Sequence, residues 1–369
     1  MRTLARRILL GLSATLVALL LAEAALRAFS MEPFPSWSPR YLHVGDDALG
    51  LVPAAHFSGR QESSEYSVAI RTNSLGLRSP EPTGEPGVDV VLLGDSFAFG
   101  QGVERERTSA HLLGVELGAA PGAPPHAVRV HNAGVMSYGT RQAVGRLRRL
   151  AAELDPDLCI LLFFAGNDPL DNVRPPLEVR AGYVVGSGRS LPWWRRVQLE
   201  IKFRWSVYRV LARAVDRRAI PGRCSDHASF GFDLFLREET PRVAGAWRAT
   251  EEALADLVRL TRGLGCPLVV AAVPTRYQVD PAWWRVHGDA CGFEDARFDL
   301  ERVQERLRVL CSDLDVPFLD VLPVFRGAAG EDRLYFEALL DMHLNAAGHA
   351  LLARELAAFL RERKLVPER

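Results

Sequence analysis

Short apolar runs alternate with longer segments whose apolar residues recur at helical spacing over most of the chain. The apolar runs, which are typical of buried strands, lie near residues 88–94, 128–132, 158–165, 267–273 and 317–321. The helical patterns lie near residues 107–118, 140–153, 241–264, 296–313 and 346–363. This alternation predicts an α/β domain in which helices cover both faces of a parallel sheet, as a three-layer sandwich.

The N-terminus carries a different pattern, a continuous apolar stretch without a polar face. Residues 8–22 are apolar or small and follow a basic start, which is typical of an export signal. The stretch reaches the ~20 residues of a membrane span only if it continues past Glu23 to Leu26. An uncleaved membrane anchor is favoured, and cleavage at the small-x-small site of residues 22–24 is the open alternative. Both place the remaining chain outside the cytoplasm, in a periplasmic or extracellular compartment.

These patterns divide the chain into three parts. We expect an anchor or signal helix in residues 1–27, a linker and small extension in 28–87, and the main domain in 88–369, with an insertion at about 169–240. Residues 28–65 are rich in Pro, Ser, Gly and His, which predicts irregular structure. The alternating stretch 66–71 and the turn residues 73–76 predict a small hairpin packed on the main domain.

The run near 88–94 stops abruptly at Gly94-Asp95-Ser96, and a loop of small residues follows it. This pattern predicts a buried strand that ends in a tight turn, which lifts one hydroxyl off the edge of the sheet. Ser96 is therefore a candidate nucleophile. Such a tripeptide more often forms an ordinary turn. The residues at the other strand ends therefore determine whether Ser96 is interpreted as catalytic.

Three further segments supply what a serine nucleophile needs. A loop of small and polar residues follows the second strand at 132–140, the third strand ends in Gly166-Asn167-Asp168, and Asp341 and His343 lie near the C-terminus. A serine needs a base, the base needs an orienting acceptor, and the tetrahedral oxyanion needs donors. Ser96, the loop and Asn167 all follow strands of a parallel sheet, whose carboxyl ends form the usual ligand edge.

In this order the four segments resemble the four blocks of the SGNH (GDSL) hydrolase family, membrane-anchored bacterial type, over residues 88–360. The resemblance implies a flavodoxin-like sheet order. It implies Ser96 as the nucleophile, His343 as the general base and Asp341 as the group that orients the imidazole. It also implies an oxyanion hole made by the backbone N–H groups of Ser96 and Ser137 and the side-chain amide of Asn167.

Two positions depart from the family pattern. Ser137 stands where the family usually has a glycine, and a backbone donor survives this change only if the backbone keeps its shape. The family commonly has Asp-x-x-His, whereas Asp341-Met342-His343 is Asp-x-His. The shorter form resembles the branch that contains bacterial polysaccharide O-acetyl-modifying proteins.

Weaker candidates surround these blocks. Gly134 and Arg276 follow strand ends and are expected to line the substrate site. His349 is a rival base, although the helical pattern near 346–363 places it inside a helix. The segment from Asn73 to Arg78 also resembles anchored family members, and a structural turn is the favoured interpretation of it.

The composition argues against some classes of function. The 369 residues carry 45 basic and 45 acidic side chains, so no net charge directs the chain to nucleic acid. The five cysteines show neither a CxxC pair nor metal-ligand spacing, and neither a metal nor a cofactor is expected. Cys159 and Cys266 are expected in the core. In an oxidising compartment one disulfide could form among Cys224, Cys291 and Cys311.

The prediction is an extracytoplasmic serine esterase acting on small-molecule or carbohydrate acyl esters, O-acetyl esters among them. The alternatives are an O-acyltransferase that acts on a cell-envelope polysaccharide and a non-catalytic carbohydrate-binding protein with the same fold. The expected partners are the substrate and a membrane, and the sequence predicts no oligomeric state. Within the insertion, residues 192–218 are basic and aromatic; they predict a core-packed helix, a membrane-surface helix or a wall of the active-site mouth.

Overall fold

A five-stranded parallel sheet forms the centre of the computed structural model, in the order β11-β10-β7-β5-β6. The strands are β5 (Val88–Leu93), β6 (Val128–Asn132), β7 (Leu158–Phe164), β10 (Leu268–Val273) and β11 (Phe318–Asp320). The structure describes residues 2–28, 39–63, 65–119, 128–180, 182–186, 192–194, 197–198, 201, 205–208, 210–211, 231–330, 333–337 and 341–366.

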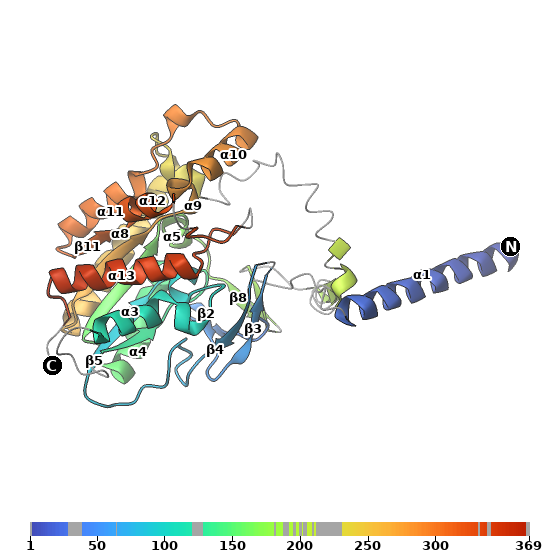
Figure 1. The fold of residues 1–369 in the computed structure, drawn as a ribbon, viewed down its shortest axis with the longest axis horizontal. Coiled ribbons are helices and arrows are strands. Elements are labelled where there is room, and N and C mark those ends of the chain that lie inside the picture. Colours follow the sequence, from blue (N-terminus) through green and yellow to red (C-terminus); the bar gives the residue numbers. More distant parts are fainter. Residues whose placement is uncertain are drawn as a thin grey trace.

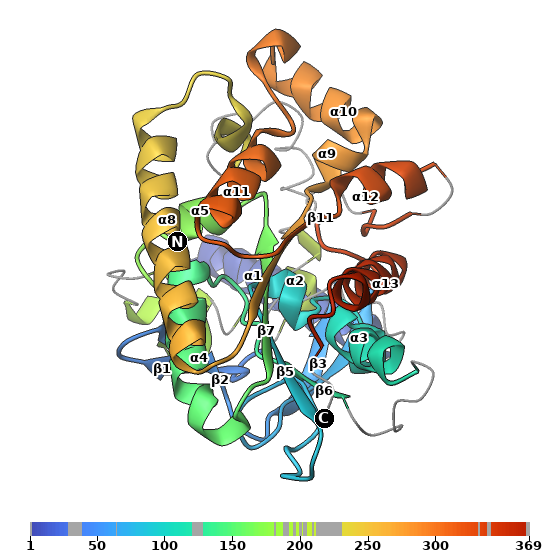
Figure 2. The same ribbon diagram turned by 90° about the vertical axis from the view of Figure 1, so that its left-hand side faces the viewer.

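Helices cover both faces of this sheet, as Figure 2 shows. One layer contains α4 (Thr140–Leu154), α8 (Pro241–Gly263) and α11 (Arg302–Asp313), and the other contains α3 (Ser109–Gly118), α12 (Leu322–Ala328) and α13 (Ala346–Glu362). Alternate strand residues serve the two layers: Val91 and Leu93 pack on the first, Val90 and Leu92 on the second. The predicted three-layer α/β fold with an N-terminal hydrophobic helix is confirmed.

The strand order locates the ligand edge of the sheet. Numbered along the chain, the order is 2-1-3-4-5, so the connections change direction between β5 and β7. Ligands bind such sheets beyond the carboxyl ends of the strands at this switch point. Ser96 follows β5 and Asn167 follows β7, so both lie at that point.

Four short strands precede the sheet, and they correct the prediction of irregular structure for residues 28–65. The strands β1 (His43–Asp46) and β2 (Gly50–Pro53) pair with each other, and β3 (Ser58–Glu62) pairs with β4 (Ser67–Arg71), both antiparallel. The hairpin partner of residues 66–71 thus precedes them rather than following the turn at 73–76. The sequence pattern hid β3 because its residues are mostly polar and Gln61 is its one fully buried side chain.

The insertion begins with α5 (Asp168–Asp171) and a hairpin of β8 (Glu178–Arg180) and β9 (Tyr183–Val185). Apolar residues of this hairpin pack with Leu49 and Leu51 against Val135 and Tyr138, which belong to the loop after β6. The Tyr41 N–H donates to the Gly182 carbonyl at 3.0 Å. The segment that follows α1 and the β8–β9 hairpin therefore meet at one corner of the domain.

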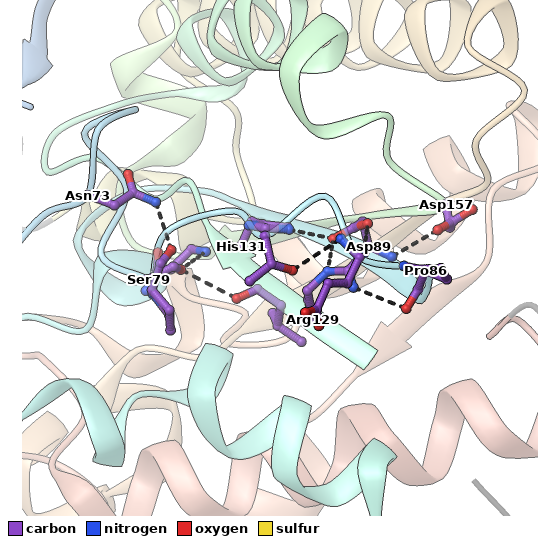
Figure 3. Close-up of polar contacts among 12 residues, drawn as sticks. Asn73, Ser79, Pro86, Asp89, Arg129, His131 and Asp157 are labelled. Atoms are coloured by element: carbon purple, nitrogen blue, oxygen red, sulfur yellow. Dashed lines mark hydrogen bonds and ion pairs between the residues drawn. The ribbon is translucent and has the colours of Figure 1, made fainter. Parts of the chain in front are cut away.

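Polar contacts hold the edge strand β6 to β5 (Figure 3). Asp89 on β5 pairs with His131 at 2.7 Å and with the Arg129 guanidinium, both on β6. Burial by itself would raise the pKa of Asp89, but hydrogen bonds from His131 and Arg129 hold it below its usual value. The Asp89 N–H also donates to Asp157 at 2.8 Å. These polar side chains hold the edge strand β6, which has only β5 as a neighbour in the sheet.

The N-terminal helix α1 (Arg2–Ala28) projects away from the α/β domain in Figure 1. Among the described residues, Leu9–Ala28 is the one helical stretch long and apolar enough to cross a membrane, a criterion that a signal sequence also meets. Cys291 is disulfide-bonded, whereas Cys159, Cys266 and Cys311 are free and buried. Cys159 and Cys266 lie in the core as expected, with 3.3 Å between their Sγ atoms. Cys224 lies outside the described residues.

Candidate active site

Ser96 is the first residue of α2 (Ser96–Phe99), a short helix directly after β5. Asp95 caps this helix, because its Oδ1 accepts the Phe97 N–H at 2.8 Å. Gly94 adopts φ +144°, and a Cβ there would lie 2.6 Å from the Leu162 carbonyl oxygen. Only glycine fits that turn without strain, and the turn presents Ser96 at the edge of the sheet.

Three side chains from two distant parts of the sequence form a hydrogen-bonded chain. The Ser96 Oγ lies 2.9 Å from His343 Nε2, and His343 Nδ1 lies 2.8 Å from Asp341 Oδ1. Both contacts are satisfied when Nδ1 carries the proton and Nε2 accepts the serine hydroxyl. This is the arrangement of a nucleophile, a base and an orienting carboxylate.

The short Asp-x-His spacing is compatible with this geometry. Asp341 Oδ1 accepts the backbone N–H of His343 at 3.0 Å in addition to the imidazole N–H. The carboxylate thus fixes both the backbone and the ring of His343 in one local turn. Asp341 is buried, and helix α13 is capped by Asn345 instead, whose Oδ1 accepts from Ala347 and Gly348.

Asn167 precedes α5 at the end of β7, beside the switch point. Its Nδ2 donates to Asp171 Oδ2 at 2.7 Å, and Asp171 also pairs with Arg174 at 2.7 Å. A primary amide has two N–H groups, so one donor of Asn167 is left for another acceptor. Asp171 thus fixes the rotamer of the Asn167 amide, which the sequence predicts to be a hydrogen-bond donor to the oxyanion.

Three buried carboxyl groups lie behind the candidate nucleophile. Burial raises the pKa of Asp95 to about 6 and that of Asp171 to about 7. Burial, and then the charges of Asp95 and Asp171, raise the pKa of Asp168 well above its usual value. Among the described residues, Asp95 Oδ2 and Asp168 Oδ1 have no hydrogen-bond partner, which also disfavours their charged forms.

Ser137 adopts a left-handed backbone conformation with φ 65°. This φ favours glycine, which explains why the related family usually has a glycine at this place. The side chain of Ser137 is exposed, while its neighbours Met136 and Tyr138 are buried. Within the described part of the chain, the backbone N–H groups of Ser96 and Ser137 donate no hydrogen bond, so both are available to a ligand.

The weaker candidates lie in different surroundings. Gly134 packs under α2, where a Cβ would lie 2.3 Å from the Phe99 nitrogen, so its close contact is with protein. Arg276 donates to the Phe336 carbonyl at 2.8 Å and is half-buried. His349 is buried inside α13, with Nδ1 3.1 Å from Ser109 Oγ, and burial lowers its pKa to about 3. His349 therefore does not reach Ser96, which leaves His343 as the candidate base.

Sequence reasoning missed two groups around the site. Gln101 is buried, and its Nε2 lies 3.3 Å from His343 Nδ1. Arg78 is buried and donates to the carbonyls of Phe99, Gly100 and Val103, in the loop that follows the nucleophile. The glutamine directly after Gly100 carried no sequence signal of its own. The sequence predicts a turn from Asn73 to Arg78. It does not predict the contact of Arg78 with the loop, because Arg78 lies 21 to 25 positions before the carbonyls that it binds.

Comparisons with known proteins match this chain to one family model and to a set of solved structures. The family model of the GDSL-like Lipase/Acylhydrolase family matches residues 92–351. Among solved structures, a mutant of the acetyl-xylooligosaccharide esterase Axe2 from Geobacillus Stearmophilus is 16% identical, covering 77% of this chain and 98% of that chain at a TM-score of 0.42. The acetyl xylan esterase AlAXEase is 13% identical, covering 73% and 98% at a TM-score of 0.42. A lipase/acylhydrolase from Enterococcus faecalis is 16% identical, covering 75% and 96% at a TM-score of 0.40.

The comparison with curated proteins found no match. Within the described residues, no group of three or more His, Cys, Asp or Glu side chains is placed to hold a metal ion.

Proposed function

The chain belongs to the GDSL-like lipase/acylhydrolase family and is an ester-hydrolysing enzyme, and we propose that it works outside the cytoplasm through Ser96, His343 and Asp341. The observation that carries this proposal is the pair of contacts of His343, 2.9 Å to Ser96 Oγ and 2.8 Å to Asp341 Oδ1. No other histidine of the described residues bonds to Ser96.

In the first half of the reaction, Ser96 Oγ forms a bond to the acyl carbon while its proton passes to His343 Nε2. Asp341 accepts the hydrogen bond of the Nδ1–H group throughout and stabilises the imidazolium. The leaving alcohol takes the proton from Nε2 as the ester bond breaks, which leaves an acyl-enzyme on Ser96. Water then loses a proton to Nε2 as its oxygen attacks the acyl carbon. The bond between the acyl carbon and Ser96 Oγ breaks, Nε2 returns the proton to Oγ, and the carboxylic acid leaves.

The oxyanion of each tetrahedral intermediate needs fixed donors. We assign these to the backbone N–H groups of Ser96 and Ser137 and to the second N–H of Asn167. The free backbone donors at Ser96 and Ser137 and the hold of Asp171 on the Asn167 amide support this assignment. Asn167→Ala should reduce kcat by roughly 10²–10³-fold, as expected for the loss of one such donor.

Two observations support a location outside the cytoplasm. The apolar stretch Leu9–Ala28 suits an anchor or a signal sequence, and the disulfide of Cys291 suits an oxidising compartment. We favour the uncleaved anchor, with secretion after cleavage as the alternative. N-terminal sequencing of the mature protein decides, because a mature chain that begins near Ala25 would refute the anchor.

The proposed substrates are acyl esters of small molecules or carbohydrates, O-acetyl esters among them. The same acyl-enzyme would serve an O-acyltransferase if a sugar hydroxyl replaced water. The Asp341-Met342-His343 spacing, which resembles that of polysaccharide O-acetyl-modifying proteins, is the reason to test this alternative. An acyl-chain-length series, run on the purified protein with and without a polysaccharide acceptor, distinguishes the two. Acyl transfer that outpaces hydrolysis would replace the esterase assignment.

The catalytic assignment is tested by Ser96→Ala and His343→Ala, which should each reduce kcat/KM by about 10⁴-fold or more. Combining them should add little, because the residues act as one unit. A fluorophosphonate probe should label the wild type and not Ser96→Ala. Unchanged turnover in Ser96→Ala would reject the mechanism, and a wild type that neither reacts with the probe nor turns over esters would favour the non-catalytic alternative.

A further inference from the structure

Large apolar side chains of segment 192–211 face solvent. The exposed fraction is 77% for Trp193 and 50% for Trp194, and exposed large side chains continue at Val197, Ile201, Val210 and Leu211. Residues 193, 197 and 201 are four apart, the spacing of apolar residues on one face of an amphipathic helix. For these residues the expectation of a core-packed helix is wrong.

The same segment is joined to α1. The Val207 N–H donates to Glu23 Oε2 at 2.9 Å, and Arg27 donates to Glu23 Oε1 at 2.8 Å. Ser206 and Val207 are buried at this contact. Figure 1 shows the short helical turns of the segment, in yellow-green, beside the C-terminal end of α1. Glu23 lies near the end of the apolar stretch Leu9–Ala28, where a membrane span would meet the headgroups.

Both connections between the domain and these elements start from one corner. The chain enters the domain at residues 39–46, and it leaves toward segment 192–211 after β9. Tyr41 and Gly182 are hydrogen-bonded there, and the Arg40 guanidinium lies 4.5 Å from the centre of the Tyr183 ring. The exposed apolar segment therefore lies where the anchor holds the domain against its membrane.

The charge of the segment suits a phospholipid surface. Residues 192–211 contain five Lys or Arg residues and one Glu, together with three tryptophans. Tryptophan favours the interface between headgroups and acyl chains, and basic residues are attracted to anionic headgroups.

We propose that Trp193, Trp194, Val197 and Ile201 lie on the anionic phospholipid surface of the membrane that α1 crosses, with Trp193 and Trp194 inserted at the headgroup level. This rests on the anchor part of the proposed function and is independent of the catalytic part. The hydrogen bond of Val207 to Glu23, on the apolar helix α1, favours a bilayer over a second copy of the chain as the occupant.

The test uses the full chain in nanodiscs of phosphatidylcholine, with and without phosphatidylglycerol, each made with and without brominated acyl chains. Bromine quenches tryptophans at the bilayer. The quenched share of the emission should be large in the wild type and should fall strongly in Trp193→Ser/Trp194→Ser. Trp247→Phe is the matched control: it removes a fully buried core tryptophan and should leave the quenched emission unchanged. Phosphatidylglycerol should increase the quenching, and added salt should reduce that increase.

The outcomes separate this inference from the others. Equal quenching in the wild type and the double variant, with both inserted in nanodiscs, would overturn the surface role and leave the anchor intact. A chain that does not co-purify with nanodiscs would refute both. Concentration-dependent cross-linking through segment 192–211 without quenching would show that a second copy covers it. Ester turnover and thermal stability of the double variant should match the wild type, so a failure of the catalytic proposal would be seen separately.

Discussion

At the scale of single residues, Ser137 carries backbone strain beside the proposed oxyanion hole. A non-glycine residue at φ 65° costs on the order of 1 kcal/mol, and a β-branched residue costs more. Because we assign the donor to the backbone N–H, Ser137→Gly and Ser137→Ala should keep kcat/KM within a few-fold. Ser137→Val should lower both the free energy of unfolding and kcat. Urea denaturation and steady-state kinetics measure the series, and a large loss in Ser137→Gly would show that the hydroxyl itself takes part.

The buried carboxyl groups predict the sign of the pH dependence of stability. A carboxyl group whose pKa is raised by folding binds more protons in the folded than in the unfolded state, between about pH 4 and its folded pKa. The contribution of the protonated carboxyl groups to the free energy of unfolding is thus fully present below about pH 4. It is lost as the pH rises through about 6 for Asp95 and about 7 for Asp171. The melting temperature should accordingly carry a component that falls between pH 5 and pH 8.

Asp168→Asn tests this dependence, because an asparagine keeps an acceptor for the Phe164 N–H and removes one titrating group from the cluster. Its melting temperature should fall less than that of the wild type between pH 5 and pH 8. Asp256→Asn, which alters a surface carboxylate paired with Arg259, is the control and should keep the wild-type slope. Parallel slopes in the wild type and Asp168→Asn would contradict the raised pKa of Asp168.

At the scale of elements, the strands before the main sheet brace the loop of the nucleophile. Arg78 donates to three carbonyls of the loop after α2, and the Gly102 N–H donates to Gln61 on β3 at 3.0 Å. Glu104 accepts the N–H of Ala69 on β4 at 3.0 Å. An extension read from the sequence as a linker thus holds the backbone on which Ser96 depends.

Two buried arginines allow a matched test of this bracing. Arg78→Met leaves the loop carbonyls unpaired and should reduce kcat by at least about tenfold, because small displacements of a nucleophile are costly. Arg146→Met removes a comparable buried arginine, which donates to the Leu75 carbonyl in the turn before Arg78. It should lower stability with little change in kcat. Equal effects on kcat would show that Arg78 is a general stability residue.

The elements also show what the sequence could predict. The five sheet strands and their covering helices were predictable because each is long enough to show a period, and the order of the four blocks predicted which strand ends meet. Strands such as β3 could not be predicted, because a short polar strand buries too few residues to produce an apolar pattern in the sequence. The contacts of Gln101 with His343 and of Asp171 with Asn167 could not be predicted for another reason: only the packing creates them.

At the scale of the whole molecule, the proposed membrane elements, α1 and segment 192–211, connect to the domain near the loop that carries Ser137. The corner from which both connections leave packs on Val135 and Tyr138, which flank Ser137 in the loop after β6. An anchor attached there would hold the site near the membrane. The anchor and the catalytic chemistry should nevertheless be separable, because the side-chain contact of α1 with the described insertion is made by Glu23 with Val207, away from Ser96.

Deleting residues 1–27 should therefore leave kcat/KM for a small soluble ester within about twofold of the value for the full chain. The lost contact lies away from Ser96, so its removal affects the free enzyme and the transition-state complex equally. It should also leave Trp193, Trp194 and their apolar neighbours without the bilayer, so the truncated protein should self-associate as its concentration rises. Trp193→Ser/Trp194→Ser in the truncated chain should reduce that association, whereas Val309→Ser, which changes an equally exposed residue on α11, should not. Sedimentation velocity and steady-state kinetics on the same samples measure both effects. A truncated chain that is monomeric but inactive would mean that α1 supports the active site itself, and the separation of anchor from catalysis would be wrong.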